Sequence, residues 1–281
     1  MWPLTSPPVV PVLRFSGTIG MVTPLRPGLS IAGAAGGIEK AFEMSKTPSV
    51  AVIVNSPGGS PVQSNLIFRR LRQLAEEKKK TVHVFCEDVA ASGGYYLAIA
   101  GDEIYADPSS ILGSIGVISA GFGLDKAIEK LGIERRVYTS GLSKSTLDPF
   151  LPEKDEDIER LKTVQRDVHD VFIGAVKERR AGKLRGPDQE LFSGAFWSAS
   201  RALEMGLIDG IGDVRTRMHE LYGKKVKLKV VPLERGGLLS RFRRLSNLVE
   251  RTGPGEGLRL ALAEDLVSAI EARALWSRFG L

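Results

Sequence analysis

The segment Asp88-Val-Ala-Ala-Ser-Gly-Gly-Tyr-Tyr96 carries the hydroxyl best placed for covalent chemistry, that of Ser92. Small residues surround Ser92 where a predicted strand passes into a predicted helix, so a substrate backbone can approach it closely. The start of that helix adds free N–H groups and positive potential at the same point. An acyl-transfer nucleophile needs this access and these oxyanion donors. By spacing alone, a helix-capping serine is the commoner explanation.

A second chemical element, Asn55-Ser-Pro-Gly-Gly59, follows an apolar run. Pro57 fixes one φ angle and the two glycines leave the next ones free, so the loop can present N–H groups outward. It can supply the other half of an oxyanion hole. An ordinary Pro-Gly turn at a strand end has the same pattern.

Candidates for a base are few. Lys144, in Gly141-Leu-Ser-Lys-Ser145, can act as a base only if burial lowers its pKa from about 10.4, and a loop lysine is usually solvated. Ser114, in Gly113-Ser-Ile-Gly-Val117, adds a hydroxyl that is also typical of a turn. We expect structural or surface roles for the three widely separated histidines, His83, His169 and His219.

The elements that must position these residues alternate between strand and helix, which predicts an α/β fold with a mostly parallel sheet. The continuous apolar run 50–54 is typical of a strand buried on both faces. Strands are predicted at residues 9–15, 50–54, 81–86, 104–106, 115–118 and 135–139. Helices are predicted at residues 38–44, 62–79, 92–100, 124–131 and 155–180.

The C-terminal part, from residue 223 onward, is more basic than the rest of the sequence. Residues 224–231 alternate lysine with apolar residues, which favours an edge strand. Amphipathic helices are predicted at 238–251 and 257–279, joined by the Gly-rich linker 252–257. We therefore expect a flexible segment 1–8, a domain 9–222 and a basic extension 223–281.

Composition excludes several classes. With 43% hydrophobic and 26% charged residues, the 281-residue chain has enough apolar material for a core, so wholesale disorder is excluded. The single cysteine, Cys86, excludes an intrachain disulfide and a Cys-rich zinc site. The apolar runs fall short of the roughly 18 residues of a spanning helix, and the proline-rich start lacks a basic region, so we expect a cytoplasmic protein.

The net charge of +6 resides in residues 224–251, which carry +7, so we expect no nucleic-acid partner.

Taken together, the four motifs resemble the signal peptide peptidase A (SppA) family of serine peptidases in its short form. Their order matches, as do the spacings of 22 residues from Ser92 to Ser114 and 30 from Ser114 to Lys144. The resemblance covers about residues 9–217. It implies a ClpP/crotonase-like fold, a spiral of ββα units with a mostly parallel sheet, here followed by a C-terminal helical extension.

The resemblance also implies roles. Ser92 would be the nucleophile, Lys144 the general base, and Ser114 the hydroxyl that holds the lysine ammonium. The N–H of Gly93 and that of Gly59 or Gly58 would form the oxyanion hole, with Gly59 weakly favoured. No cofactor or metal is implied. The family is similar to ring-forming oligomers whose sites are completed across interfaces, so we expect a homo-oligomer that cleaves short, extended, apolar peptides.

Family members often carry an N-terminal membrane anchor, which this sequence does not show. Its basic C-terminal helices are expected to pack on a subunit or on the core, with peripheral contact to an anionic membrane as the alternative. Two other functions fit the fold. A crotonase-like acyl-CoA enzyme would use the same oxyanion donors but needs a carboxylate base, and a non-catalytic scaffold would need no intact dyad.

Overall fold

A computed structural model describes residues 6–20, 28–141, 143–233 and 256–281, with side chains described in the last range from residue 266 onward. The described elements, in chain order, are β1 Val9–Ser16, α1 Ile31–Glu43, β2 Ser49–Ser56, α2 Pro61–Lys78, β3 Thr81–Ala91, α3 Gly93–Ala98, β4 Glu103–Ala106, β5 Ile111–Gly113, α4 Asp125–Lys130, α5 Asp155–Arg179, α6 Asp188–Leu191, β6 Phe196–Ser198, α7 Ala199–Glu204, β7 Gly210–Ile211, α8 Val214–Tyr222, β8 Lys227–Val230 and α10 Glu256–Ser277.

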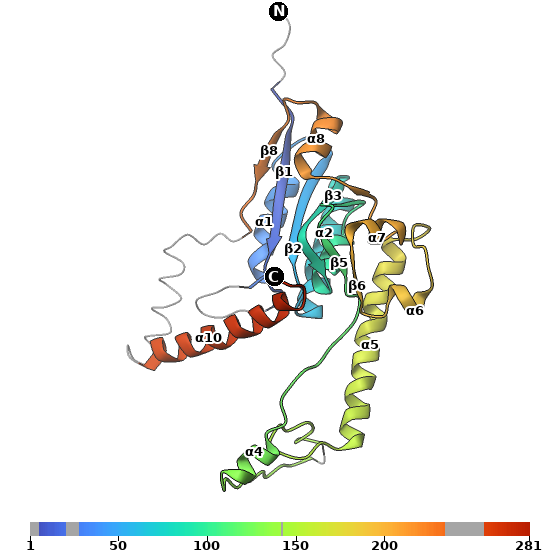
Figure 1. The fold of residues 1–281 in the computed structure, drawn as a ribbon. Coiled ribbons are helices and arrows are strands. Elements are labelled where there is room, and N and C mark those ends of the chain that lie inside the picture. Colours follow the sequence, from blue (N-terminus) through green and yellow to red (C-terminus); the bar gives the residue numbers. More distant parts are fainter. Residues whose placement is uncertain (1–5, 21–27, 142, 234–255) are drawn as a thin grey trace, which may run out of the picture.

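The strands form one eight-stranded sheet with the order β6-β5-β3-β2-β1-β8, while β4 pairs with β3 and β7 pairs with β4 (Figure 1). The pairings are parallel except for that of β5 with β6. The predicted α/β fold with a mostly parallel sheet is confirmed. β8 lies at one end of the strand order, so the prediction of an edge strand is confirmed too.

Both faces of the central strand β2 are buried. Val50, Val52 and Val54 belong to the main core, to which α1, α2, α3 and α5 contribute. The alternate residues Ala51 and Ile53 point to a second core that contains Met218 of α8. Because successive side chains of a strand point to opposite faces, burial on both sides requires an uninterrupted apolar run. This is why the run 50–54 predicted the strand.

β3 is longer than predicted, and its second half delivers the chain to Ser92. Its register on β2 shifts from Val54 opposite Cys86 to Ser56 opposite Ala90. Before the shift β3 pairs with β4, and after it β3 pairs with β5. A bulge of this kind bends a strand and redirects the residues beyond it. β3 therefore serves two neighbours and ends beside the loop after β2.

The Gly-rich start of α1 was not predicted. The helix begins at Ile31 rather than near residue 38, and Ser30 caps it by accepting a hydrogen bond from the Gly33 N–H at 3.3 Å. Glycine has a low helix propensity, so the glycines in residues 33–37 argue against a helix there and the first turns were not predicted. Packing of this segment against the core outweighs the propensity, because Ala34 and Gly37 are buried.

Residues 117–154, here called the arm, project away from the sheet between β5 and α5, with α4 near the far end (Figure 1). α4 has no buried residue, and Phe122 and Tyr138 are 85% and 91% exposed. The strands predicted at 115–118 and 135–139 are wrong, since neither segment forms a strand. A strand needs a neighbouring strand to pair with its backbone N–H and C=O groups. In the described part of this chain, neither segment has such a neighbour.

The end of α10 returns to the sheet, and the helix predicted at 257–279 is confirmed. Phe279 is 7% exposed, packs with Val89 and Ala91 of β3, and meets Phe196 of β6 edge to face at 5.2 Å. The helix predicted at 238–251 lies outside the described residues. None of the described helices combines the length and apolar character needed to cross a membrane.

Candidate active site

Ser92 lies on the tight turn between β3 and α3 in a backbone conformation that favours glycine. Its φ is 52° and its ψ is −121°. The Ser92 N–H donates to the Gly113 carbonyl at 2.8 Å, which fixes the turn to the end of β5. Ser92 occupies the N-cap position of α3, yet its side chain accepts no capping hydrogen bond. Capping therefore does not explain this serine. A strained strand-to-helix turn is the geometry that exposes nucleophilic serines elsewhere.

The loop after β2 lies directly against this turn. Gly58 has a φ of +107°, and a Cβ built on it would lie 2.8 Å from the Ser92 Cβ and 2.9 Å from the Gly93 nitrogen. A Cβ on Gly59, whose φ is +140°, would lie 2.1 Å from the Ile19 carbonyl oxygen. Only glycine fits at either position, so the two glycines are required for this close approach.

Backbone N–H groups surround Ser92, and they are not all used internally. The Gly58 N–H donates to Ser56 Oγ at 3.2 Å. Within the described ranges, the N–H groups of Gly59 and Gly93 donate to no acceptor. Gly93 is the first residue of α3, where helix N–H groups lack intrahelical partners. Gly59 and Gly93 line the same pocket as Ser92, and in the described ranges their N–H groups have no acceptor, whereas the Gly58 N–H is engaged.

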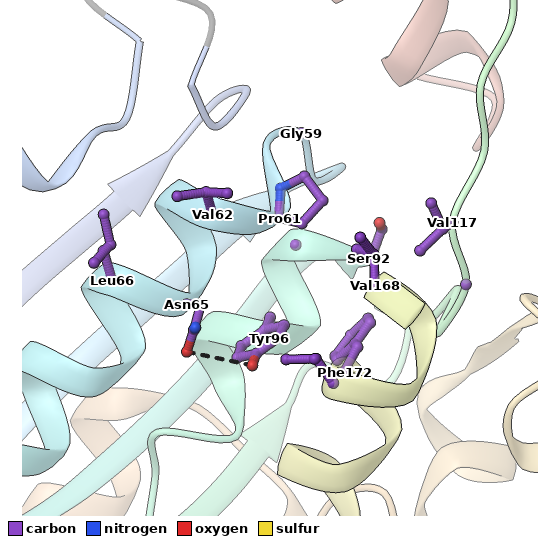
Figure 2. Close-up of a pocket in the computed structure, with 13 residues that line it drawn as sticks. Gly59, Pro61, Val62, Asn65, Leu66, Ser92, Tyr96, Val117, Val168 and Phe172 are labelled. Carbon is purple, nitrogen blue, oxygen red and sulfur yellow. Dashed lines mark hydrogen bonds between the residues drawn. The ribbon is translucent and has the colours of Figure 1, made fainter. Parts of the chain in front are cut away.

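An apolar pocket of about 210 Å³ opens on one side of Ser92 (Figure 2). Its lining comes from the Gly loop, α2, α3, the start of the arm and α5, namely Gly59, Pro61, Val62, Asn65, Leu66, Ser92, Gly93, Tyr96, Gly116, Val117, Val168, Val171 and Phe172. Tyr96 stacks on Phe172 at 4.6 Å, and burial raises the pKa of its phenol. The pocket can accept one apolar side chain of a substrate bound over Ser92.

A second pocket of about 220 Å³, here called the polar pocket, opens beside Ser92 and is lined by Ser92, Ser114, Gly116, Val117, Ile118, His169, Ser193, Gly194 and Arg278. Ser114 is buried with a φ of 50°, and its N–H donates to the Ala195 carbonyl at 2.6 Å. His169 Nε2 lies 2.9 Å from the Ile115 carbonyl oxygen, so the imidazole ties α5 to the root of the arm. The fold thus places Ser114 and Ser92 in the lining of one pocket.

Lys144 is not brought to this place within one chain. It is exposed on the arm, in a turn whose Lys144 N–H donates to the Gly141 carbonyl at 3.3 Å, and it lines neither pocket. Of the six predicted site residues, five lie together and the predicted base lies apart. Among the described residues of the single chain, no lysine lines either pocket beside Ser92.

A second group of side chains has the hydrogen-bond order of a catalytic triad, but its serine and histidine are buried. Ser49 Oγ lies 3.1 Å from His83 Nε2, and His83 Nδ1 lies 3.0 Å from Glu103 Oε2. Tyr222 hydroxyl occupies a further position on Ser49 Oγ at 2.6 Å. Ser49 is 2% exposed, so no substrate carbonyl can reach it. Burial lowers the pKa of His83, although the neighbouring Glu103 raises it. The group is structural, as the sequence predicted for this histidine.

Other reactive groups do not compete with Ser92. Burial raises the pKa of the Cys86 thiol to about 12, which removes the thiolate that a cysteine nucleophile needs. Within the described ranges, no three His, Cys, Asp or Glu side chains are grouped so that they could hold a metal ion.

Sequence reasoning missed the contributions of α5 and α10 to the site. Val168, Val171 and Phe172 lie in the helix predicted at 155–180, but nothing local in the sequence indicated that they line a pocket. His169 was assigned to a surface or structural role, and Arg278 was not singled out. The aromatic rings of Tyr96 and Phe172 line the apolar pocket, and the sequence pattern did not indicate it.

A serine on a strained turn, free N–H donors beside it and an apolar pocket are the parts of an acyl-transfer site. The family model described as Peptidase family S49 matches residues 74–229, which include β3, the Ser92 turn, the arm and α5. The chain therefore belongs to peptidase family S49. The resemblance drawn from the four motifs is confirmed at this level.

Individual relatives carry two kinds of name. The chain is 54% identical over 275 residues to the Brucella abortus (strain 2308) protein named Na(+)/H(+) antiporter NhaA, a match that covers 97% of this chain and 37% of that protein. It is 32% identical to the Arabidopsis thaliana protein named Serine protease SPPA, chloroplastic, over 72% of this chain and 30% of that protein. It is also 32% identical to Protease 4 of Haemophilus influenzae, over 62% of this chain and 28% of that protein.

The chain thus spans between about a quarter and two fifths of the length of these relatives. The part of the Brucella protein that matches this chain is therefore similar to a peptidase of family S49.

Proposed function

We propose that this chain is a serine endopeptidase that cleaves short, extended, apolar peptides through an acyl-enzyme. The observation that carries the proposal is the position of Ser92, on a strained turn between two free N–H donors and the mouth of an apolar pocket. An apolar substrate side chain would enter that pocket and bring its carbonyl carbon over the Ser92 hydroxyl. Such positioning supplies a large part of the barrier reduction.

In the first step, Ser92 Oγ bonds to the carbonyl carbon while its proton passes to a base, and the oxyanion accepts hydrogen bonds from the N–H groups of Gly59 and Gly93. The base then returns the proton to the leaving amine as the C–N bond breaks. Water repeats the sequence on the acyl-enzyme and frees the serine. Each oxyanion donor typically contributes about 10²–10³ in rate, and the proton transfer about 10²–10⁴.

We propose Lys144 of the partner subunit as the base. A lysine can accept a proton at neutral pH only where burial keeps it uncharged, and Lys144 is exposed within one chain. The arm that carries it displays large apolar side chains, including Phe122, Leu131 and Tyr138. Such a patch marks a protein interface. An assembly that covers the arm would bury Lys144 and could place it at Ser114, whose hydroxyl lines the polar pocket beside Ser92.

Complementation tests this assignment. Ser92→Ala and Lys144→Ala chains, each with a different affinity tag, are co-expressed and purified through both tags, and turnover of a fluorogenic apolar peptide is measured. Each variant alone should be inactive. In randomly mixed rings about one quarter of the sites combine an intact serine with an intact lysine from a neighbour, so about a quarter of wild-type activity should return. Lys126→Ala, on the same arm, is the matched control and should retain wild-type turnover.

Two results would overturn the proposal. Wild-type turnover by Ser92→Ala or Lys144→Ala excludes the dyad. Mixed assemblies as inactive as the parent variants, with both kinds of chain present, exclude a lysine supplied across an interface.

The acyl-CoA alternative finds less support. A crotonase-like enzyme would use the same N–H donors but relies on a carboxylate base. In the part of the chain that the structure describes, no Asp or Glu lines either pocket beside Ser92. Labelling of Ser92 by a fluorophosphonate distinguishes the two functions, because only the peptidase uses a serine nucleophile. A non-catalytic scaffold would show neither labelling nor turnover.

The exposed apolar residues of α10 supply one more element of the proposal. Leu266, Val267 and Ile270 are exposed although the end of the helix is docked. We propose that this face packs on a neighbouring subunit, with an anionic membrane surface as the alternative. Flotation with anionic liposomes, comparing the full chain with a truncation before Leu238, distinguishes the two, because only membrane contact makes flotation depend on the extension.

A further inference from the structure

The polar pocket contains a cation that the proposed dyad does not use. Arg278 lines this pocket together with Ser92, Ser114 and His169, although it lies 186 positions after Ser92 in the chain. A guanidinium is protonated at any physiological pH and carries five N–H donors in a planar fork. The chain thus places a permanent positive charge within one cavity of about 220 Å³ that also holds the nucleophile.

The neighbouring Phe279 fixes the backbone of Arg278 at this place. Phe279 is buried against Val89 and Ala91, the last part of β3 before Ser92, and contacts the Phe196 ring edge to face. Its N–H donates to the Trp276 carbonyl at 2.9 Å, so the chain turns as it leaves α10. Arg278 itself is exposed, with its guanidinium carbon 6.0 Å from the Phe279 ring centroid. The buried Phe279 thus holds the chain in place, while the guanidinium of Arg278 stays accessible to a ligand.

The lining of the polar pocket leaves this charge without an anion. Among the residues that the structure describes, no Asp or Glu lines the pocket. Among the residues whose side chains are described, no carboxylate lies within 4.0 Å of the Arg278 guanidinium, whereas Arg14, Arg70, Arg72, Arg135, Arg136, Arg179, Arg180, Arg201 and Arg217 each have such a partner. A cationic wall in a pocket of hydroxyl and backbone groups favours an anionic ligand.

The two pockets that Ser92 helps to line differ in the chemistry that they can bind. The apolar pocket includes Gly59 and Gly93, whose N–H groups would receive the oxyanion, so it serves the acyl side of the scissile bond. The polar pocket then serves the amine side. Its volume limits what it can enclose to a short stretch of chain, so a group that reaches Arg278 lies close to the bond that is cut.

We infer that Arg278 is a specificity-determining residue that binds a substrate carboxylate on the amine side of the scissile bond, within about one residue of it. The inference rests on the proposed peptidase function. The carboxylate can belong to the C-terminus of a short peptide or to an Asp or Glu side chain, and a guanidinium binds both in the same forked geometry.

The test uses four fluorogenic peptides that share one apolar residue on the acyl side. Two end one residue after the scissile bond, either as the free carboxylate or as the amide. Two are longer amides with Asp or Asn at that position. A charge-assisted hydrogen bond to a partly exposed guanidinium should raise kcat/KM for the charged member of a pair about 10- to 100-fold over its neutral match.

Arg278→Gln should reduce this ratio to about one, and Arg278→Lys should retain part of it. Arg273→Gln changes an exposed arginine of α10 that lies outside the pocket; it is the matched control and should keep the wild-type ratio. The pair that shows the effect identifies the source of the carboxylate, a chain terminus or an acidic side chain.

A binding measurement separates this inference from the proposed function. Anisotropy of the labelled peptides on Ser92→Ala protein should show tighter binding of the charged members, and Arg278→Gln on that background should abolish the difference. Equal binding and equal turnover of charged and neutral peptides by intact Arg278 overturn the inference while the peptidase stands. A ratio that survives Arg278→Gln overturns it too, because a group other than Arg278 would then distinguish the charged peptide from the neutral one. Absence of Ser92-dependent cleavage of every peptide overturns the proposed function.

Discussion

Gly58→Ala should disable the site by pushing on the nucleophile rather than by removing a reacting group. The added methyl carbon would lie 2.8 Å from the Ser92 Cβ, 2.9 Å from the Gly93 nitrogen and 3.0 Å from the Ala91 carbonyl oxygen. All three belong to the turn that aims the serine. None is the flexible end of a long side chain, so the clash can be relieved only by moving backbone.

The size of the effect can be worked out from these distances. Non-bonded carbons rest about 3.5–4.0 Å apart, so the turn and the loop must separate by about 1 Å. A misplacement of about 1 Å in a catalytic group costs about 100-fold in rate. The φ of +107° at Gly58 adds backbone strain of about 1–3 kcal/mol once a Cβ is present. We therefore expect both a lower free energy of unfolding and a loss of about 100-fold in kcat.

Gly17→Ala is the matched control. Gly17 has a similar φ of +98°, and a Cβ built on it meets nothing within 4 Å. It should lose stability through strain alone and keep kcat within a few-fold of the wild type. Urea unfolding and peptide turnover of both variants, measured on the assembled protein, check this. A folded Gly58→Ala enzyme with wild-type kcat would refute the placement of the Gly loop against Ser92.

Three further changes probe the framework. Because burial lowers the pKa of His83, its neutral form stabilises the fold, so the free energy of unfolding should decrease as the pH falls below about 6.5, the value in unfolded chains. His83→Gln should flatten that dependence in pH-resolved urea titrations, and an unchanged slope would contradict it. Arg180 is 1% exposed and donates to Asp209 at 2.7 Å, so Arg180→Met should lower stability by about 3–5 kcal/mol, and adding Asp209→Asn should restore part of this loss. Phe172→Ala removes a wall of the apolar pocket, so it should lower the free energy of unfolding by about 3–5 kcal/mol. It should also shift kcat/KM towards peptides with bulkier apolar residues. If the variant ranks the peptides as the wild type does, the assignment of the pocket is contradicted.

The sheet and the core of the site could be predicted because their signals are local. The run 50–54 is apolar throughout because β2 is buried on both faces. Neighbouring parallel strands end at the same edge of a sheet, so the loop after β2 and the turn after β3 had to lie close together. That geometry brings Gly58 to Ser92, and strand order alone is enough to predict it.

The rest depends on contacts that the sequence pattern does not encode. Residues 135–139 have the composition of a strand but find no partner strand in the described chain, and Lys144 comes after them on the exposed arm. The apolar pocket needs α5 folded back against α3, and Arg278 reaches the site because Phe279 docks on β3. These are long-range associations, and one of them is proposed to require a second subunit.

The backbone of Ser92 has a consequence for the family history of such chains. A conformation that glycine adopts freely and serine adopts only under strain is maintained as long as the hydroxyl is useful. Where turnover is no longer selected, replacing this serine by glycine removes the backbone strain and raises the free energy of unfolding. Glycine at this position in a relative would therefore indicate a chain that keeps the fold without the catalytic hydroxyl.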